Sequence, residues 1–207
     1  MKKLLLLFLS LIATAFATTR ITMVRNEKVI AYEEILHPAE NESGSDGFPS
    51  VTIFLSDGPV QIMDEAGKPK LVTVKAGEVL FRLAKSWKLY AASNVEIRFV
   101  RVEFCGKGSA ETWGRTGVAP DYKLPLENHY CRVTDIRFAA GTNEPLHSHH
   151  ARVVICFSGA QLRHRLPDGR EEESSLKTGE VVWRKSATHI GQNVGKTDFW
   201  AVTVEPK

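Results

Sequence analysis

An internal repeat is the feature that most constrains the fold of this chain. When the sequence is shifted by 102 positions without gaps, identical residues superpose between positions 51 and 103. A single offset held over so long a stretch indicates two copies of one structural unit. We therefore expect two similar domains, at residues 18–104 and 130–207. The matched pairs are Val51 with Val153, Ile53 with Ile155, Ser56 with Ser158, Lys75 with Lys177, Gly77 with Gly179, Glu78 with Glu180, Val79 with Val181, Arg82 with Arg184, Val100 with Val202, Val102 with Val204, and Glu103 with Glu205.

Each half consists of short segments that are rich in β-branched and aromatic residues. Turn sequences such as SDG at 56–58 and PDG at 167–169 separate them, and no segment after residue 17 has the long period of a helix. Short strands at such intervals are typical of sandwiches and barrels. We predict an all-β chain of two small jelly-roll barrels in tandem. The predicted strands are VTIFL, LVTVK, EVLFRL and IRFVRVEF in the first half, and CRVTDIRF, RVVICF, AQLRHRL, EEESSLK, EVVWR and FWAVTVE in the second.

Residues 105–129 join the two halves and show no regular period. The segment is rich in glycine and contains two prolines, which indicates a linker or a long loop. We expect Trp113 and Tyr122 to anchor it on a domain surface. Cys105 and Cys131 flank it, and the sequence leaves open a disulfide, worth about 3 kcal/mol of stability, or two free thiols. Cys156 lies in a strand pattern and is expected to be a small buried apolar residue.

The first 17 residues have the layout of a secretory signal peptide. Two lysines precede an apolar run over residues 4–12, and AFA at 15–17 is a small-x-small cleavage site. The run is short for a membrane span, although a retained anchor is the alternative. We expect export to the bacterial periplasm or the extracellular space, without stable membrane insertion after cleavage.

The charge balance argues against some classes of partner. The chain has 27 basic and 24 acidic residues, and loss of Lys2 and Lys3 with the signal peptide leaves 25 basic residues. A near-neutral chain does not favour nucleic acid or anionic membrane surfaces. A small-molecule substrate or ligand is the expected partner. A homodimer through exposed barrel edges or sheet faces is compatible with such a fold.

The second half carries a cluster of histidines. Three of the seven histidines of the chain are His147, His149 and His150, just before a β-branched run. On an extended segment, His147 and His149 point to the same face and can converge on one ion. Two ligands hold a metal poorly, and the best third candidate is His189, after the strand EVVWR. The alternative is a polar loop that contains histidines by chance.

Two motifs in this half resemble those of the cupin superfamily, and the whole chain resembles a bicupin. The first motif, G-x5-H-x-H followed by Glu and Gly, is matched by Gly141, His147, His149 and Gly159. The second motif, G-x5-P-x-G-x2-H-x3-N, is matched by Gly179, His189 and Asn193. The resemblance implies a divalent metal inside the barrel, with His147, His149 and His189 as its ligands.

The motifs also depart from the family pattern. The Glu of the first motif is missing, and Arg152, Val153 or Val154 stands in its place. Lys185 and Ala187 replace the Pro and Gly of the second motif, which is one residue short. What remains is a three-His site, which is similar to that of some cupin dioxygenases. Imidazole ligands suit one divalent Fe, Mn, Ni, Cu or Zn ion, and the sequence does not choose among them.

The first half repeats the scaffold without the histidines. The same offset carries His147, His149 and His189 back to Ser45, Gly47 and Trp87. None of these side chains ligates a metal as histidine does. We expect the first domain to be a degenerate barrel that helps the second to pack or to dimerise.

Other residues near the cluster are candidates for a pocket or a supporting role. His164 faces the interior if its strand alternates, and either substrate contact or a buried hydrogen-bonded histidine would fit. Arg152 could meet an anionic substrate at the mouth, although a solvated surface arginine is the simpler interpretation. Gln192 and Asn193 follow His189 closely, and the Asn could serve only to form a turn.

Strand alternation separates the remaining candidates. Trp183 and Arg184 are neighbours on one strand, so that one faces inward and the other outward. Arg82 is the counterpart of Arg184 in the half without histidines, which favours a structural role for both. We interpret His150 as a surface or rim residue. His37 and His129, which have no partner pattern, are also expected at the surface.

The resemblance and the three-His pattern imply a metal-dependent oxidase or dioxygenase acting on a small organic molecule, with catalytic residues that the sequence does not identify. A hydrolase or isomerase using the metal as a Lewis acid is also open. A second hypothesis is a non-catalytic module that binds a metal or a small ligand. A third is a structural pair of barrels with an accidental histidine cluster, because the fold alone does not set the function.

Overall fold

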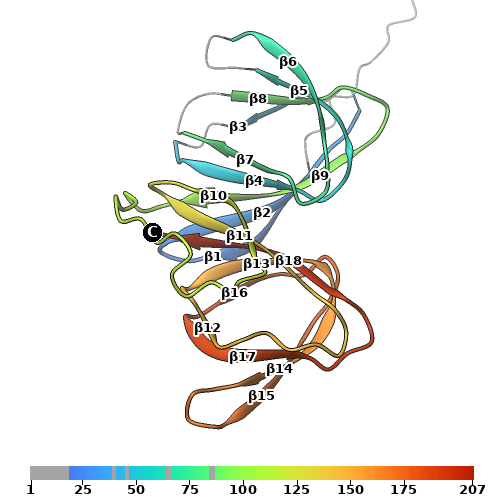
Figure 1. Cartoon of the computed structure of the whole chain (residues 1–207). Coiled ribbons are helices and arrows are strands. Elements are labelled where there is room, and N and C mark those ends of the chain that lie inside the picture. Colours follow the sequence, from blue (N-terminus) through green and yellow to red (C-terminus); the bar gives the residue numbers. More distant parts are fainter. Residues whose placement is uncertain (1–18, 39–40, 45–46, 64–66, 84–86) are drawn as a thin grey trace, which may run out of the picture.

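The computed structural model describes residues 19–207 except 39–40, 45–46, 64–66 and 84–86. The proposed signal peptide lies outside the described residues. The described part consists of strands and turns, and it contains no helix that could cross a membrane. Figure 1 shows two barrels stacked on each other, with the larger sheet of each at the centre.

The first barrel pairs a five-stranded sheet, in the order β1-β2-β9-β4-β7, with a four-stranded sheet, in the order β3-β8-β5-β6. Neighbouring strands in both sheets are antiparallel. The strands are β1 (Thr19–Arg25), β2 (Val29–Leu36), β3 (Asn41–Gly44), β4 (Ser50–Phe54), β5 (Gly58–Met63), β6 (Pro69–Val74), β7 (Val79–Arg82), β8 (Trp87–Ala91) and β9 (Ile97–Phe104).

The second barrel repeats this arrangement strand for strand. Its five-stranded sheet has the order β10-β11-β18-β13-β16, and its four-stranded sheet has the order β12-β17-β14-β15. The prediction of an all-β chain with two jelly-roll barrels in tandem is confirmed. The strands are β10 (Lys123–Glu127), β11 (Cys131–Phe138), β12 (His147–His149), β13 (Arg152–Ser158), β14 (Ala160–Arg165), β15 (Glu171–Leu176), β16 (Val181–Arg184), β17 (Ala187–Asn193) and β18 (Phe199–Pro206).

The two five-stranded sheets pack face to face and bury a shared hydrophobic core. Val51 and Val102 of the first sheet and Val153 and Val204 of the second are fully buried in it. These are residues that the repeat matches, so part of the internal identity of the sequence maps to the interface between the barrels. Strands β4 and β18 are buried on both faces, because one face meets this shared core and the other meets the interior of its own barrel.

The segment that joins the barrels is held against the second one. It includes β10, which pairs with β11 at the edge of the second five-stranded sheet. The Glu127 carboxylate accepts hydrogen bonds from the backbone N–H groups of Trp113 and Gly114, at 2.6 and 2.8 Å, and from Lys207 Nζ at 2.7 Å. These bonds fix the path of the chain toward Tyr122.

All three cysteines carry free thiols in the structure, including Cys105 and Cys131, whose pairing the sequence left open. Cys156 is buried in the interior of the second barrel, among apolar neighbours. Burial raises the pKa of Cys131 to about 12 and that of Cys156 to about 11. Both thiols are therefore poor nucleophiles.

Candidate metal centre

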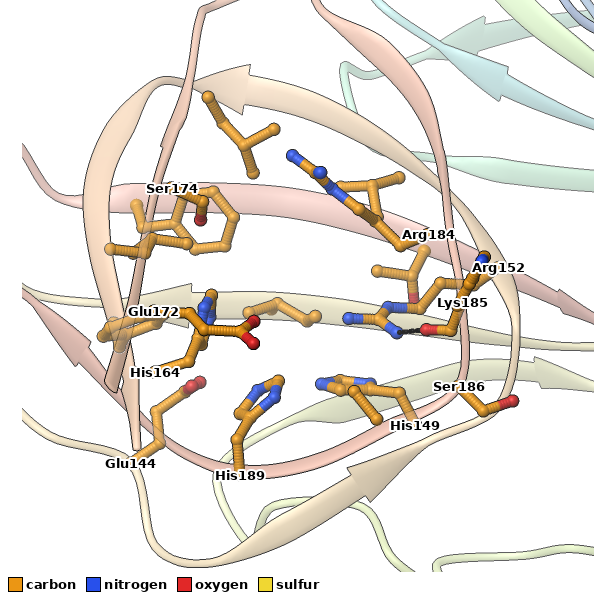
Figure 2. Close-up of a pocket in the computed structure, with 18 of the residues that line it drawn as sticks. Glu144, His149, Arg152, His164, Glu172, Ser174, Arg184, Lys185, Ser186 and His189 are labelled. Carbon is orange, nitrogen blue, oxygen red and sulfur yellow. Dashed lines mark hydrogen bonds between the residues drawn. The ribbon is translucent and has the colours of Figure 1, made fainter. Parts of the chain in front are cut away.

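Strands β12 and β17 bring the three predicted histidines together. The strands pair antiparallel with His147 directly opposite His189, and His149 lies two residues further along β12 on the same face. One nitrogen from each imidazole lies within 4.8 Å of the others. Figure 2 shows His149 and His189 side by side at one end of the pocket.

The spacing of the nitrogens fits a metal ion. His147 Nε2 and His149 Nε2 are 2.9 Å apart. With metal–nitrogen bonds of about 2.0–2.1 Å, two ligands at right angles would be separated by about 3 Å. His147 Nδ1 lies 2.8 Å from the carbonyl oxygen of Pro145 and donates a hydrogen bond to it, which leaves the Nε2 lone pair toward the cluster. The residues present therefore fit a metal bound by imidazole nitrogens.

Burial keeps these imidazoles neutral. It lowers the pKa of His189 to about 3 and that of His164 to about 4, and it lowers the pKa of His147 and His149 as well. The positive charge of Arg152 is a further cause for all four. A neutral imidazole is the form that binds a metal, so the cluster is in its ligand state at neutral pH.

A buried carboxyl and a buried phenol lie beside the cluster. The Tyr122 hydroxyl donates a hydrogen bond to Glu144 Oε1 and lies 3.5 Å from His147 Nε2. Glu144 Oε2 is 3.9 Å from the same nitrogen. Burial raises the pKa of Glu144 to about 7, and burial together with the nearby Glu144 charge raises the pKa of Tyr122. A side chain at Gly191 would clash with Glu144, so the glycine makes room for the carboxyl.

Sequence reasoning missed both of these residues as part of the site. Tyr122 belongs to the segment expected to be a linker, and from the sequence we expected it only to anchor that segment on a domain surface. Glu144 precedes the His-x-His pair, whereas the family motif places its Glu after the pair. A signal for Glu144 was available, because it lies only three residues before His147.

A second ion pair supports the outer side of His149. Glu205 Oε1 lies 3.8 Å from His149 Nδ1 and accepts a hydrogen bond from the His150 backbone N–H at 3.0 Å. Arg132 Nε donates to the other carboxylate oxygen of Glu205 at 2.5 Å. Arg132 and Glu205 are each only 1% exposed. The pair therefore holds the Glu205 carboxylate in a fixed position behind one of the candidate ligands.

The cluster opens onto a cavity of about 380 Å³ between the two sheets of the second barrel. Its wall combines apolar and charged groups, which is typical of small-molecule sites. The apolar lining residues are Ile136, Phe138, Val154, Leu162, Leu166, Leu176, Ala187 and Phe199. The polar and charged lining residues are Tyr122, Glu144, His149, Arg152, His164, Glu172, Glu173, Ser174, Arg184, Lys185, Ser186, His189 and Thr203.

Two of the further candidates line this cavity. His164 lies with its ring centroid 4.3 Å from that of His189. Arg152 is buried, 8% exposed, so the simpler interpretation as a solvated surface arginine is wrong. Its backbone position at the start of β13, opposite Arg184 on β16, places both side chains on the interior face of the sheet.

The other candidates lie elsewhere. Trp183 packs against the core shared by the two barrels, and Arg184 is the one of these two neighbours that lines the cavity. Gln192 forms a backbone bridge with Asn143 and does not line the cavity. Asn193 is fully buried and bonds Thr197 O and Gly195 N, so it fixes a turn.

The remaining histidines lie at the surface. His150 is exposed and stacks on Trp113 with ring centroids 3.8 Å apart. His129 is also exposed, and its Nε2 lies 2.9 Å from Lys107 O. His37 lies 2.8 Å from the exposed carboxylate of Glu96. None of the three contributes to the cavity of the second barrel.

The corresponding strands of the first barrel carry no such group. In the pairing of β3 with β8, Gly44 lies opposite Trp87, as His147 lies opposite His189. Ser45, which the sequence offset had matched to His147, lies outside the described residues. Gly47 lies in a turn with φ of 81°. Within the described ranges, the metal-type cluster is the one formed by the three histidines of the second barrel.

Solved structures share this architecture, although no protein-family model and no curated protein matches the sequence. AerE from Microcystis aeruginosa is 12% identical with a TM-score of 0.64, over 92% of this chain and 97% of that one. A cupin 2 conserved barrel domain protein from Leptotrichia buccalis is 13% identical with a TM-score of 0.59, over 92% of this chain and 89% of that one. The chain has the cupin fold.

An enzyme is also found among the structures with this cupin fold. Oxalate decarboxylase from Bacillus subtilis, described with Mn(II) centres, is 13% identical with a TM-score of 0.59. The match covers 91% of this chain and 72% of that one. At these low sequence identities the similarity shows the cupin fold alone. The chemistry has to be inferred from the residues of the site.

Proposed function

We propose that this protein is an exported bicupin with one mononuclear metal site in its second barrel, and that it oxidises or dioxygenates a small organic molecule there. The observation that carries the proposal is the convergence of three imidazoles, with ligand atoms within 4.8 Å, at the edge of a cavity of about 380 Å³. Three protein ligands leave coordination positions open for a second molecule.

The ligand set suits one divalent first-row ion: Mn, Fe, Ni, Cu or Zn. When bound, the ion would supply Lewis-acid or redox chemistry at its open positions. His147, His149 and His189 would hold it, and the Pro145 carbonyl and the Glu205 carboxylate would orient two of these rings. The Mn(II) centres of the Bacillus subtilis oxalate decarboxylase make manganese the first ion to test.

An acid–base group beside the metal favours an enzyme over a passive binding protein. The hydrogen-bonded Tyr122 and Glu144 lie next to His147, inside the barrel. A carboxyl whose pKa is raised to about 7 can hold or release a proton near neutral pH. This pair replaces, from a different part of the sequence, the acidic group that the family motif would have supplied after His149.

A non-catalytic module that binds a metal or a small ligand is the second candidate. The absence of the motif Glu favours this candidate. Arg152 and Val154, which stand at its place in the sequence, face the cavity and supply no carboxylate. Such a module would bind metal through the same three histidines and show no turnover.

Metal content and oxygen uptake test the proposal together. The protein, purified without a metal-affinity tag, should contain about one first-row metal ion per chain. His147→Ala and His189→Ala should lose it, whereas His150→Ala, a matched change at an exposed neighbour, should keep it. Oxygen uptake would then be screened with phenols, diketones and carboxylic acids. Metal without turnover on any of them favours the binding module, and no metal in any form of the protein overturns the metal site.

Export is tested separately by cell fractionation. The full chain should appear in the periplasm or the medium in a form that begins near residue 18, and a chain lacking residues 1–17 should stay in the cytoplasm. Retention of both forms in the cytoplasm would contradict export and leave the metal site unaffected. Size determination of the purified protein would show whether it forms a homodimer.

A further inference from the structure

Arg152 presents a buried guanidinium with few partners to the cavity. Its Nη1 makes only two long hydrogen bonds, 3.4 Å to His150 O and 3.3 Å to Lys185 O. Its Nε is buried without any hydrogen-bond partner. In the described part of the chain, Arg152 forms no ion pair, and its Nη2 donates to no protein group. In Figure 2 the guanidinium, marked by the dashed bond to Lys185, projects into the pocket near His149.

The other deeply buried arginines have a carboxylate against them. Arg132 is 2.5 Å from Glu205, and Arg101 is 3.2 Å from Glu34. Burial of a cation without a paired anion is costly, whereas a paired one is partly compensated. Arg152 is 8% exposed and makes no direct ion pair with a described residue, and the carboxylates of Glu205 and Glu144 act on it only from beyond ion-pair distance. A directly hydrogen-bonded anion is therefore the partner that the Arg152 guanidinium lacks within the described ranges of the chain.

The rest of the cavity indicates the shape and the charge of a ligand that could pair with Arg152. Arg184 lies opposite Arg152 in the strand register and adds a second positive charge on the same face. Three acidic residues also line the cavity. Glu172 and Glu173 of β15 have exposed side chains and each faces an arginine: Glu173 is 2.8 Å from Arg163, and Glu172 is 3.9 Å from Arg170. The third, Glu144, is buried and accepts the hydrogen bond of the Tyr122 hydroxyl.

The apolar part of the lining lies around the interior of the same barrel. Ile136, Leu162, Leu176 and Phe199 belong both to the barrel core and to the cavity wall. A small anion without an apolar part would leave this apolar wall in contact with water. A carboxylate suits the planar guanidinium fork, which binds it through two parallel hydrogen bonds.

We propose that the second barrel binds a small carboxylate with an apolar body, its carboxylate on Arg152 and its body against the apolar wall. This inference deepens the proposed function and rests on it for the metal beside the ligand. Such a molecule would be the substrate of the enzyme or the cargo of the binding module. The apolar body would lie within the cavity lined by His149 and His189.

Calorimetry on the protein as purified tests the inference. The probes are acetate, butyrate, hexanoate and benzoate, with benzamide as the uncharged analogue of benzoate. We expect affinity to rise from acetate to hexanoate and benzoate to bind more tightly than benzamide. Arg152→Met should weaken benzoate binding by about 10- to 100-fold, as expected for the loss of a charge-assisted hydrogen bond. Arg165→Met, the same change at an exposed position of β14, should leave it unchanged.

The variants also separate failure of this inference from failure of the metal site. Arg152→Lys keeps the charge but loses the fork, so intermediate binding is expected if Arg152→Met does not fold. Benzoate bound no better than benzamide by the unmodified protein, or equally well by a folded Arg152 variant, overturns the carboxylate subsite, and metal content then reports separately on the metal site. Benzoate binding that depends on Arg152 in a protein without metal would support the subsite and contradict the proposed metal function.

Discussion

The two barrels have the same strand order and a common core, yet their interiors are used differently. In the first barrel, Glu34 on β2 and Arg101 on β9 form a fully buried ion pair at 3.2 Å. The same positions of the second barrel are Ile136 on β11 and Thr203 on β18, and both line the cavity. The first interior is thus bridged by charges of the chain itself, whereas the second keeps space beside a histidine cluster.

This difference shows where such a fold tolerates change. Several residues on the outer faces of the two five-stranded sheets are identical under the repeat, and all of them lie in the one shared core: Val51 and Val153, Ile53 and Ile155, Val100 and Val202, and Val102 and Val204. Residues that face the barrel interiors have diverged, because each interior is closed or opened independently. Changes inside one barrel should therefore leave the interior of the other unaffected, whereas changes in the shared core should affect the two halves equally.

The largest effect is expected from the ion pair of the first barrel. Glu34→Leu removes the carboxylate against Arg101, and breaking a buried pair from one side costs about 3–5 kcal/mol of unfolding free energy. The double change Glu34→Leu with Arg101→Met should recover part of this loss, since an apolar replacement of both buried partners is often neutral. The partly exposed Arg20, 3.1 Å from Glu34, still loses its carboxylate in both variants. Denaturant unfolding measures both. Metal content should stay unchanged, and its loss would contradict the independence of the two interiors.

The next effect concerns the second barrel alone. A metal present at about 100 times its dissociation constant should stabilise the metal-free protein by about 2.7 kcal/mol. His147→Ala should remove this stabilisation, because it deletes a ligand, while His129→Ala at the surface should retain it. Thermal unfolding with and without Mn, Fe, Ni, Cu or Zn is the measurement. Equal stabilisation of the unmodified protein and of His147→Ala would place the metal somewhere else.

The sequence predicted much of the scaffold because its signals are local or periodic. Short β-branched segments, turn residues and the constant offset indicate two barrels, and the His-x-His spacing with His189 brings three imidazoles to one place. The burial of Arg152 was not predictable in this way. It depends on which face of β13 meets the cavity, and this follows from the sheet packing rather than from its neighbours in sequence.

Two site residues escaped prediction for a related reason. Tyr122 reaches the cluster because hydrogen bonds to the Glu127 carboxylate fix the path of the chain before it. The donors are the backbone N–H groups of residues 113 and 114 and the side chain of Lys207, and these contacts span up to 80 positions in the chain. Glu144 becomes buried only when β17 passes over it with a glycine at position 191. Long-range contacts of this kind leave no periodic pattern in the sequence.

A smaller and symmetric effect is expected at the shared core. Val102→Ala in the first barrel and Val204→Ala in the second each remove two methyl groups from a fully buried position. The expected cost is about 2 kcal/mol for each, from the lost burial and the cavity left behind. Denaturant unfolding should show similar losses for both variants. A much larger loss for one of them would mean that the two sheets do not contribute equivalently to this interface.

The smallest effect is the change in stability of the metal-free protein with acid pH, which we assign to groups in the interior of the second barrel. In the unfolded chain a histidine takes up a proton near pH 6.5, whereas burial lowers the pKa of His164 to about 4 and that of His189 to about 3 in the folded chain. Between these values the unfolded state binds more protons, so the stability that these groups contribute is present above pH 6.5 and is lost as the pH falls.

Glu144 acts in the opposite direction and makes the net effect small. Its pKa is raised from 4.5 to about 7, so its contribution is present below pH 4.5 and is lost as the pH rises through 7. The lowered histidines outnumber this single raised carboxyl, and we expect a net loss of stability from pH 7 to pH 5 in denaturant titrations. Glu144→Gln should steepen the loss and His164→Asn should flatten it. If His164→Asn left the slope unchanged, the acid response would have to arise outside the second interior, and the contrast between the barrels would not extend to pH.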